Sequence, residues 1–289
     1  MIHGLTNLYL YAATKLKVSF VSKDKNRVCI LNGTGFFVTK GKNMYLITNR
    51  HMIDITYDEK RRNDYDGYSL AMIEFDTRVF VEGENKVLSK EYIMHSFKYK
   101  FAQDKEDDIA CLYGILVKGS ETPQPVRIPY DMLATSDYIN QKLSVCDFVA
   151  FVGFPDGVID MHNNMPVLRS GVISSDPRLD YNCLAEFDGH VIAYEAFSTG
   201  GASGSPVFAL QKGFLVKGVL EASEGFYREP KLIGINAANI IKPIKVNNEK
   251  DIVKEHQQIS IMYKSNYIAA LIDACEEELL TAIAESNAE

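Results

Sequence analysis

A long series of short β-rich runs most constrains what this chain can fold into. The runs fill most of the first 250 residues, and Leu16–Phe20, Tyr45–Thr48, Val145–Val152 and His190–Ala196 are examples. Gly, Pro, Asn and Asp separate the runs at short intervals, as they do in turns. Many short strands with frequent turns are typical of an all-β barrel or sandwich.

The pattern changes toward the C-terminus. From Ser265 onward, apolar residues recur at helical spacing, namely Tyr267, Ile268, Leu271, Ile272, Cys275, Leu279, Leu280 and Ile283. Residues 118–130 contain three prolines and no clear periodicity, which is typical of a connection between two halves. We therefore expect an N-terminal lobe over residues 1–120, a C-terminal lobe over residues 121–250 and a helical extension over residues 251–289.

The charge balance limits what the chain can bind. Lys and Arg number 31 and Asp and Glu number 38, which gives a formal net charge of −7. Sequence-independent nucleic-acid binding and docking on an anionic membrane both need a basic surface, so we expect neither. No apolar run approaches the ~18 residues of a membrane span. The N-terminus also lacks the basic stretch of a signal peptide.

The cysteines indicate the redox environment. There are five, widely spaced and without a C-x-x-C pair, at Cys29, Cys111, Cys146, Cys183 and Cys275. This pattern predicts mostly buried, unpaired thiols in a reducing compartment and gives no support to a structural zinc site. We therefore expect a cytoplasmic protein.

The sharpest local motif is GGASGSPVF at residues 200–208. Glycines on both sides of Ser203 let the backbone aim N–H groups at one point. A nucleophilic serine needs such donors to stabilise the oxyanion of its reaction. Taken alone, the motif fits a Gly/Ser-rich hairpin loop equally well.

A nucleophilic serine also needs a base and an acid that orients the base. His51 ends the run LITNRH and is the candidate base. Asp108 heads the apolar run IACL and is the candidate acid, with Asp107 as its nearest rival. Neighbouring residues of a strand face opposite sides, so only one of the two aspartates can point inward. Each residue is weak evidence alone, but the order His, Asp, Ser is a known arrangement of such a triad.

In this order the sequence resembles trypsin-like serine peptidases, and most closely the bacterial branch near the HtrA-type protease domain. The resemblance covers residues 28–240 and rests on six collinear motifs. These are GTGFF with TNRH at 33–51, DIA at 108–110, VGFPDG at 152–157, RSGVIS at 169–174, GASGSP at 201–206 and LIGIN at 232–236. Coincidence is a poor explanation for six motifs in one order.

The resemblance implies a chymotrypsin fold, with two six-stranded antiparallel β-barrels, the site between them and the C-terminal helix packed on the second barrel. It implies a serine endopeptidase that cleaves protein or peptide substrates through an acyl-enzyme and needs no metal or cofactor. Ser203 would be the nucleophile, His51 the base and Asp108 the orienting acid, because the spacing to Ile109 favours Asp108 over Asp107. The N–H groups of Gly201 and Ser203 would form the oxyanion hole.

Some positions depart from relatives of this kind. Ala202 stands where secreted digestive enzymes carry an Asp that pairs with a newly cleaved N-terminus, so such activation is not expected. Met52 replaces the cysteine that follows the catalytic His in secreted relatives. About 50 residues follow Asn236, too few for the peptide-binding PDZ domain of HtrA-type proteins.

The sequence indicates least about the residues that line the specificity pocket. Phe197, six residues before Ser203, and Asn236 would line it, which favours a small or apolar residue before the scissile bond. Residues 218–221 are an alternative to 232–236 as the pocket strand, although GIN favours the later one. Residues 211–230 would then be an inserted hairpin, on which Glu221, Glu224 or Glu229 could favour basic substrates.

Two further functions stay open. The fold could serve as a catalytically inactive peptide-binding module. It could also be a resting peptidase whose oxyanion loop forms only when an activating protein partner or a substrate binds, because a peptide flip at Gly200 and Gly201 costs little.

Overall fold

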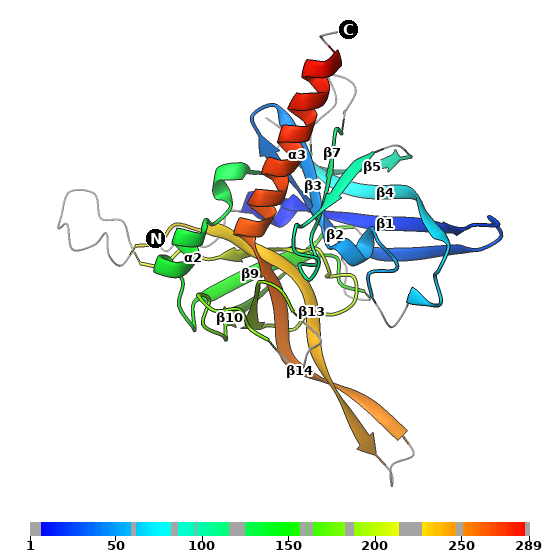
Figure 1. Cartoon of the computed structure of the whole chain (residues 1–289). Coiled ribbons are helices and arrows are strands. Elements are labelled where there is room, and N and C mark those ends of the chain that lie inside the picture. The colour runs from blue at the N-terminus through cyan, green and yellow to red at the C-terminus, as the bar shows by residue number, and fades with distance from the viewer. Residues whose placement is uncertain are drawn as a thin grey trace.

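Two β lobes and a long C-terminal helix make up the computed structural model (Figure 1). The structure describes residues 7–58, 62–81, 86–95, 97–115, 125–156, 160, 164–182, 188–213, 227–246 and 251–286. The predicted all-β class with a C-terminal helix is confirmed. The predicted boundary at residue 120 and the candidate strands and glutamates within 214–226 lie outside the described residues.

The N-terminal lobe is one sheet of eight strands. Their order is β5-β4-β1-β2-β3-β7-β6, with β8 paired in parallel to β2. The strands are β1 (Ala13–Ser22), β2 (Val28–Lys40), β3 (Asn43–Thr48), β4 (Tyr68–Val81), β5 (Lys86–Met94), β6 (Lys98–Phe101), β7 (Ala110–Tyr113) and β8 (Arg127–Pro129).

This lobe departs from the six-stranded barrel that we expected. The long strand β4 pairs with β1 through its first half and with β5 through residues Ile73–Val81, so β5 occupies one edge of the sheet. Among the described residues, no ladder joins β6 at the other edge to β4 or β5. β8 was expected in the C-terminal lobe, but its pairing with β2 places it in the N-terminal sheet.

The C-terminal lobe is a closed barrel in the order β10-β11-β14-β13-β12-β9, as predicted. Its strands are β9 (Phe148–Gly153), β10 (Val167–Ile173), β11 (Val191–Glu195), β12 (Pro206–Ala209), β13 (Lys231–Val246) and β14 (Asp251–Lys264). β13 and β14 continue beyond the barrel as a projecting hairpin (Figure 1). Residues 251–264 were expected in the helical extension. They instead form the strand between β11 and β13, because their pairing closes the barrel.

Short helices connect the strands. They are η1 (Asn7–Ala12), η2 (Arg50–Met52), η3 (Tyr130–Met132) and α2 (Ser136–Lys142). Thr135 caps α2 by accepting a hydrogen bond from the Tyr138 N–H. Of the described helices, none is both long and apolar enough to cross a bilayer.

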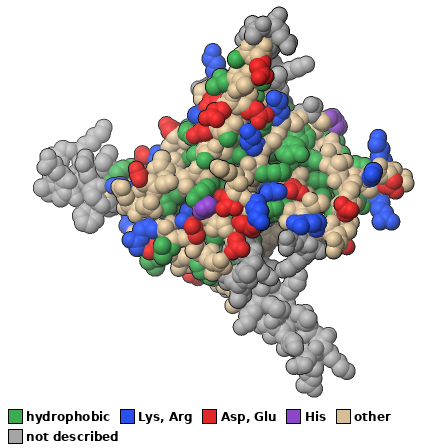
Figure 2. All heavy atoms as spheres, viewed as in Figure 1, with side chains coloured by type: hydrophobic (Ala, Val, Ile, Leu, Met, Phe, Trp, Pro, Cys, Tyr) green, Lys and Arg blue, Asp and Glu red, His purple; other side chains and the backbone are tan. Residues whose placement is uncertain are grey.

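Helix α3 (Ser265–Ser286) begins where the apolar spacing predicts. Its apolar face contacts β13 and β14, as expected, but also β6 and β7 of the first lobe. Its acidic residues, which usually face solvent, partly bind that lobe. Asp273 lies 3.0 Å from the Lys40 ammonium, and Glu278 lies 2.9 Å from that of Lys100. Figure 2 shows acidic side chains along this helix, with basic side chains beside it.

The main core belongs to both lobes at once. One cluster of buried side chains unites Phe36 and Tyr45 of the first lobe with Phe208 and Ile235 of the second and with Ile272 of α3. Because burial of apolar surface is the dominant stabilising term in folding, this shared core fixes the lobes relative to each other.

Candidate active site

The predicted site residues come from loops of both lobes. His51 lies in η2, directly after β3, and Asp108 lies just before β7. Ser203 lies in the loop before β12 of the second lobe. Thr34 of β2, which is fully buried, connects that loop to the first lobe. Its N–H donates to the Ser203 carbonyl at 2.8 Å, and its hydroxyl donates to the Gly201 carbonyl at 2.8 Å.

The Asp108 carboxylate holds His51 at two points. One carboxylate oxygen accepts the His51 backbone N–H at 2.9 Å, and the other lies 2.6 Å from Nδ1 of the ring. The Asn49 side chain donates to the Asp108 carbonyl at 2.8 Å and fixes its backbone. Because an ionised carboxylate only accepts, Nδ1 carries the proton and Nε2 is the basic nitrogen of the neutral ring.

The neighbouring aspartates point to different histidines. The Ile109 N–H donates to the Asp107 carbonyl at 2.8 Å, which makes Asp108 the central residue of a three-residue turn. Asp108 faces His51, whereas Asp107 faces His190, its carboxylate lying 3.0 Å from Nδ1 of that ring. The expectation that only one of the two aspartates points inward is wrong, because both are buried and both lie in the turn before β7, where strand alternation does not apply.

The loop around Ser203 depends on Gly204. Gly204 has a φ of +87°, and a Cβ there would lie 1.8 Å from the Thr34 carbonyl oxygen, so only glycine fits. Its N–H donates to the Asn236 carbonyl at 2.8 Å. The Ser203 hydroxyl donates to the Ala237 carbonyl at 3.0 Å. This hydroxyl has one hydrogen, so it must release the Ala237 carbonyl before it can donate to His51.

The turn before Ser203 has a defined peptide orientation. The Ala202 N–H donates to the Thr199 carbonyl at 3.1 Å, and Gly201 has a φ of +80°, as in a type II turn. The Gly200 carbonyl accepts the Asp156 N–H at 2.7 Å. Because C=O and N–H of a trans peptide point in opposite directions, the Gly201 N–H points away from Asp156.

Two buried tyrosines surround the acid. Burial raises the pKa of Tyr57 and of Tyr263 well above the ordinary value, and the Asp108 carboxylate adds to both shifts. Both phenols therefore stay neutral over the pH range in which a histidine titrates. The guanidinium of Arg50, next to His51, lies over the Tyr57 ring and pairs with Asp54 at 3.1 Å.

The sequence profile of the trypsin-like peptidase domain matches residues 33–216, which is more than half of the chain. The chain belongs to the trypsin-like peptidase family. The family membership predicted from the motifs is therefore confirmed, and the closed barrel beside a second β lobe agrees with the predicted chymotrypsin-like fold.

The chain also shows similarity to solved structures. The peptidase domain is similar to the crystal structure of Deg5 at 17% identity, covering 80% of this chain and 83% of Deg5 with a TM-score of 0.43. It is also similar to the HtrA-type protease AlgW with decapeptide at 17% identity, covering 90% of this chain with a TM-score of 0.46. This chain spans 62% of AlgW, less than two thirds of it. No curated protein gives a significant match.

Asn236 supports the loop that carries Ser203 from inside the peptidase domain. It is 1% exposed. Its amide nitrogen donates to the Ala202 carbonyl at 2.8 Å and to the Ser198 hydroxyl at 3.1 Å. Its amide oxygen accepts the Tyr194 hydroxyl at 2.6 Å. Because these partners use both ends of the amide, Asn236 braces the loop and does not present its side chain as a pocket wall.

Phe197 is exposed, in contrast to the buried Asn236. Its ring is 51% exposed and lies 5.4 Å below the Arg169 guanidinium. It lines a hollow of about 400 Å³ together with Phe148, Gly171 and Glu195. None of the predicted triad residues lines this hollow. The preferred strand, residues 232–236, is part of β13, whose next residue is Ala237, the acceptor of the Ser203 hydroxyl.

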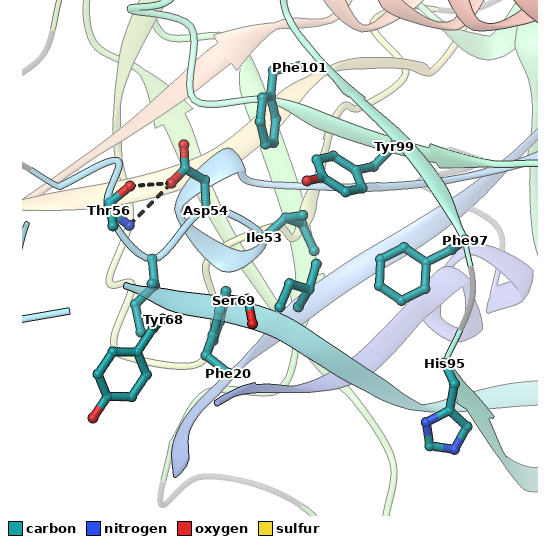
Figure 3. A pocket seen from close by; sticks show the side chains of 12 residues that line it. Phe20, Ile53, Asp54, Thr56, Tyr68, Ser69, His95, Phe97, Tyr99 and Phe101 are labelled. Atoms are coloured by element: carbon teal, nitrogen blue, oxygen red, sulfur yellow. Dashed lines mark hydrogen bonds between the residues drawn. The ribbon is translucent and has the colours of Figure 1, made fainter. Parts of the chain in front are cut away.

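A hollow of about 650 Å³ belongs to the first lobe of the peptidase domain (Figure 3). Its walls are mainly aromatic, including Phe20, Tyr68, Phe97, Tyr99 and Phe101. Asp54 on its floor accepts hydrogen bonds from Thr56, so its carboxylate is already occupied. Across the described residues, no three His, Cys, Asp or Glu side chains gather as metal ligands.

Several residues of the site gave no clear signal in sequence. Thr34 and Asn49 lie within the recognised motifs GTGFF and TNRH, so motif position could have indicated them. Asp156 likewise lies within the motif VGFPDG. His190 lies in none of these motifs, and only folding brings it to Asp107, 83 residues away.

Proposed function

We propose that this chain is a serine endopeptidase that hydrolyses peptide bonds with Ser203 as nucleophile, His51 as base and Asp108 as orienting acid. The observation that carries the proposal is the two-point contact of Asp108 with His51, at 2.9 Å and 2.6 Å. Such a contact fixes the ring tautomer and stabilises the imidazolium that forms during the reaction.

In the first half of the reaction, the Ser203 hydroxyl releases the Ala237 carbonyl and its Oγ attacks the substrate carbonyl carbon. His51 Nε2 takes the hydroxyl proton, and the carbonyl oxygen becomes an oxyanion. The C–N bond then breaks, and the leaving amine takes the proton from His51. The Ala237 carbonyl, which the hydroxyl has left, becomes available to a backbone N–H of the substrate.

In the second half, a water molecule loses a proton to His51 and adds to the acyl-enzyme. The ester C–O bond breaks, and the proton returns from His51 to Ser203 Oγ. The N–H groups of Gly201 and Ser203 would stabilise both oxyanions, and one such donor contributes about 3 kcal/mol in other enzymes.

The peptide orientation at Gly200 supports an oxyanion hole that is formed without a partner. The Asp156 N–H holds the Gly200 carbonyl at 2.7 Å, so that carbonyl is directed toward Asp156 and the Gly201 N–H is directed away from it. This arrangement favours the active peptidase over a resting form that an activating partner must switch. Protein or peptide substrates with a small or apolar residue before the scissile bond remain the expected substrate class.

Labelling with a fluorophosphonate probe tests the proposal, because the probe reacts with an activated serine whatever the substrate. We expect the native chain to label and the variants Ser203→Ala and His51→Ala to lose labelling. Gly213→Ala, in the loop after β12, is not a suitable control, because the φ of +72° at Gly213 would strain an alanine. Ser174→Ala, an exposed serine outside the site, is the matched control and should label fully.

Each labelling outcome favours a different function. Labelling that survives in Ser203→Ala would assign the nucleophile to another residue. A native chain that binds peptides but never labels would favour the inactive peptide-binding module. A positive result would be followed by a peptide library to define the cleavage preference.

A further inference from the structure

A second Asp–His pair lies directly beside the first and repeats its geometry. The Asp107 carboxylate accepts the backbone N–H of His190 at 2.9 Å and lies 3.0 Å from Nδ1 of the same ring. Asp108 makes the same two contacts with His51. Adjacent aspartates thus each hold one histidine by its backbone and its ring.

The second pair connects the two lobes. Asp107 lies in the turn before β7 of the first lobe, and His190 comes immediately before β11 of the second. Asp107 is 1% exposed. Burial raises the pKa of its carboxyl, and the hydrogen bonds from His190 oppose this rise. A buried carboxylate is strongly bound by its hydrogen-bond donors, because losing one leaves an uncompensated charge.

Neighbouring residues hold the Asp107 and His190 side chains in place. Gly189 has a φ of +95°, and a Cβ there would lie 2.8 Å from an Asp107 carboxylate oxygen, so glycine permits the close approach. The His190 ring stacks on Tyr267 of α3, with centroids 3.8 Å apart and planes 17° apart. The Lys264 N–H donates to the His190 carbonyl at 3.0 Å.

The position of Asp107 controls the direction of Asp108. The Asp107 carbonyl accepts the Ile109 N–H and closes the three-residue turn around Asp108. A shift of Asp107 therefore rotates the peptide from which the Asp108 side chain projects. A misplacement of about 1 Å in a catalytic group can reduce the rate about a hundredfold.

From this geometry we infer that His190 is a positioning residue. Through Asp107 it holds the turn that aims Asp108 at His51, and it fixes that turn to the lobe that carries Ser203. The inference rests on the proposed function, because positioning matters to a rate only if His51 is the base.

Several titratable groups lie around the pair. Asp104 and Asp108 lie on the same segment, Tyr57 follows η2, Tyr263 lies on β14 and Tyr267 on α3. Burial raises the pKa of all three tyrosines, so they remain neutral over the acid limb of a pH profile. The nearby Lys264 ammonium pairs with Asp180 at 2.8 Å.

The test compares three changes at the pair with one control. His190→Phe keeps a ring to stack on Tyr267 but removes the Nδ1 donor, and His190→Asn restores an N–H donor near that position. Asp107→Leu combined with His190→Phe replaces the buried pair by apolar side chains, which usually preserves stability. Asp180→Asn breaks the neighbouring pair with Lys264 and is the control.

We expect His190→Phe and the double variant to lower kcat about tenfold to a hundredfold, with KM nearly unchanged. A nearby carboxylate favours the charged form of an imidazole, and this effect weakens when the carboxylate is displaced. Since His51 must be neutral to accept a proton, the acid limb of kcat/KM should move to lower pH. His190→Asn should recover most of the rate, and Asp180→Asn should behave as the native chain.

A spectroscopic measurement separates this inference from the proposed function. The proton on His51 Nδ1, 2.6 Å from the Asp108 oxygen, should give a strongly deshielded NMR resonance in the native chain. It should move or broaden in His190→Phe and in the double variant but not in Asp180→Asn. If the native chain neither labels nor hydrolyses peptides, the proposed function fails, and this resonance still decides the positioning role.

Two results would overturn the inference. One is a native rate, acid limb and Nδ1 resonance in a folded His190→Phe or double variant. The other is a loss of thermal stability in His190→Phe that the double variant repairs together with the full rate, since the pair would then serve the fold alone.

Discussion

At the scale of single residues, Thr34 joins the lobes at the nucleophile loop. Its hydroxyl donates to the Gly201 carbonyl at 2.8 Å and accepts the Phe154 N–H at 3.1 Å, and its own N–H binds the Ser203 carbonyl. One buried side chain thus satisfies backbone groups on both sides of the interface. Buried backbone groups that lose such a partner cost free energy.

We predict that Thr34→Val destabilises the protein by about 1–3 kcal/mol, because it leaves the Phe154 N–H and the Gly201 carbonyl buried without this partner. Labelling of Ser203 should fall as well, since Gly201 precedes the nucleophile. Chemical denaturation and probe labelling measure the two effects. Thr39→Val, later on the same strand and less buried, is the control, and an equal loss in both variants would contradict the prediction.

At the scale of elements, only one face of helix α3 packs into the core. Ile268, Leu271, Ile272 and Cys275 are buried in the cluster shared by both lobes, whereas Ile283 near the end of the helix is 58% exposed. The apolar spacing predicted the helix and the first part of its buried face, but Leu280 and Ile283 of the same spacing are each 58% exposed. The spacing could not predict that the buried face contacts the first lobe, because that contact depends on where β14 ends in the folded molecule.

We predict that Ile272→Ala destabilises the protein by about 2–5 kcal/mol, because it opens a cavity in the shared core. Ile283→Ala makes the same chemical change on the exposed face and should stay within about 0.5 kcal/mol of the native chain. Thermal or denaturant unfolding gives both values. Similar effects for the two variants would mean that α3 is not packed as described.

Local motifs predicted some parts of the site better than others. His51, Asp108 and Ser203 lie in short motifs whose spacing indicates their expected roles. The structure brings His51 and Asp108 together. Asn236 also lay in a motif, but its buried hydrogen bonds make it a brace. Phe197 was assigned by its distance from Ser203 in sequence, and sequence distance does not say which surface a side chain faces.

At the scale of the whole molecule, a polar seam attaches α3 to the first lobe. It consists of Lys40 and Lys100 on the lobe with Asp273, Glu276 and Glu278 on the helix. The Tyr113 hydroxyl also donates to Glu278, at 2.5 Å. This hydrogen bond and the one from Lys100 lower the pKa of Glu278.

We predict that the seam weakens in acid. Because the pKa of Glu278 is lower in the folded state than in the unfolded chain, its contribution is present above the unfolded value of about 4.3 and is lost as pH falls through the folded value. Glu278→Gln should therefore lower the melting temperature slightly near about pH 7 and make no difference near about pH 3. Glu277→Gln, on the exposed side, is the control, and a Glu278→Gln effect that persists in acid would contradict the prediction.

The strand β14 has a consequence for how the protein is made. It lies between β11 and β13, so the barrel that presents Ser203 cannot close until residues 251–264 have left the ribosome. Helix α3, which seals the shared core, is made later still. The half that carries His51 and Asp108 is synthesised first but lacks Ser203, the proposed nucleophile. Hydrolytic activity would thus be among the last properties that a growing chain acquires, and this order of synthesis would spare the nascent chain and its ribosome from premature cleavage.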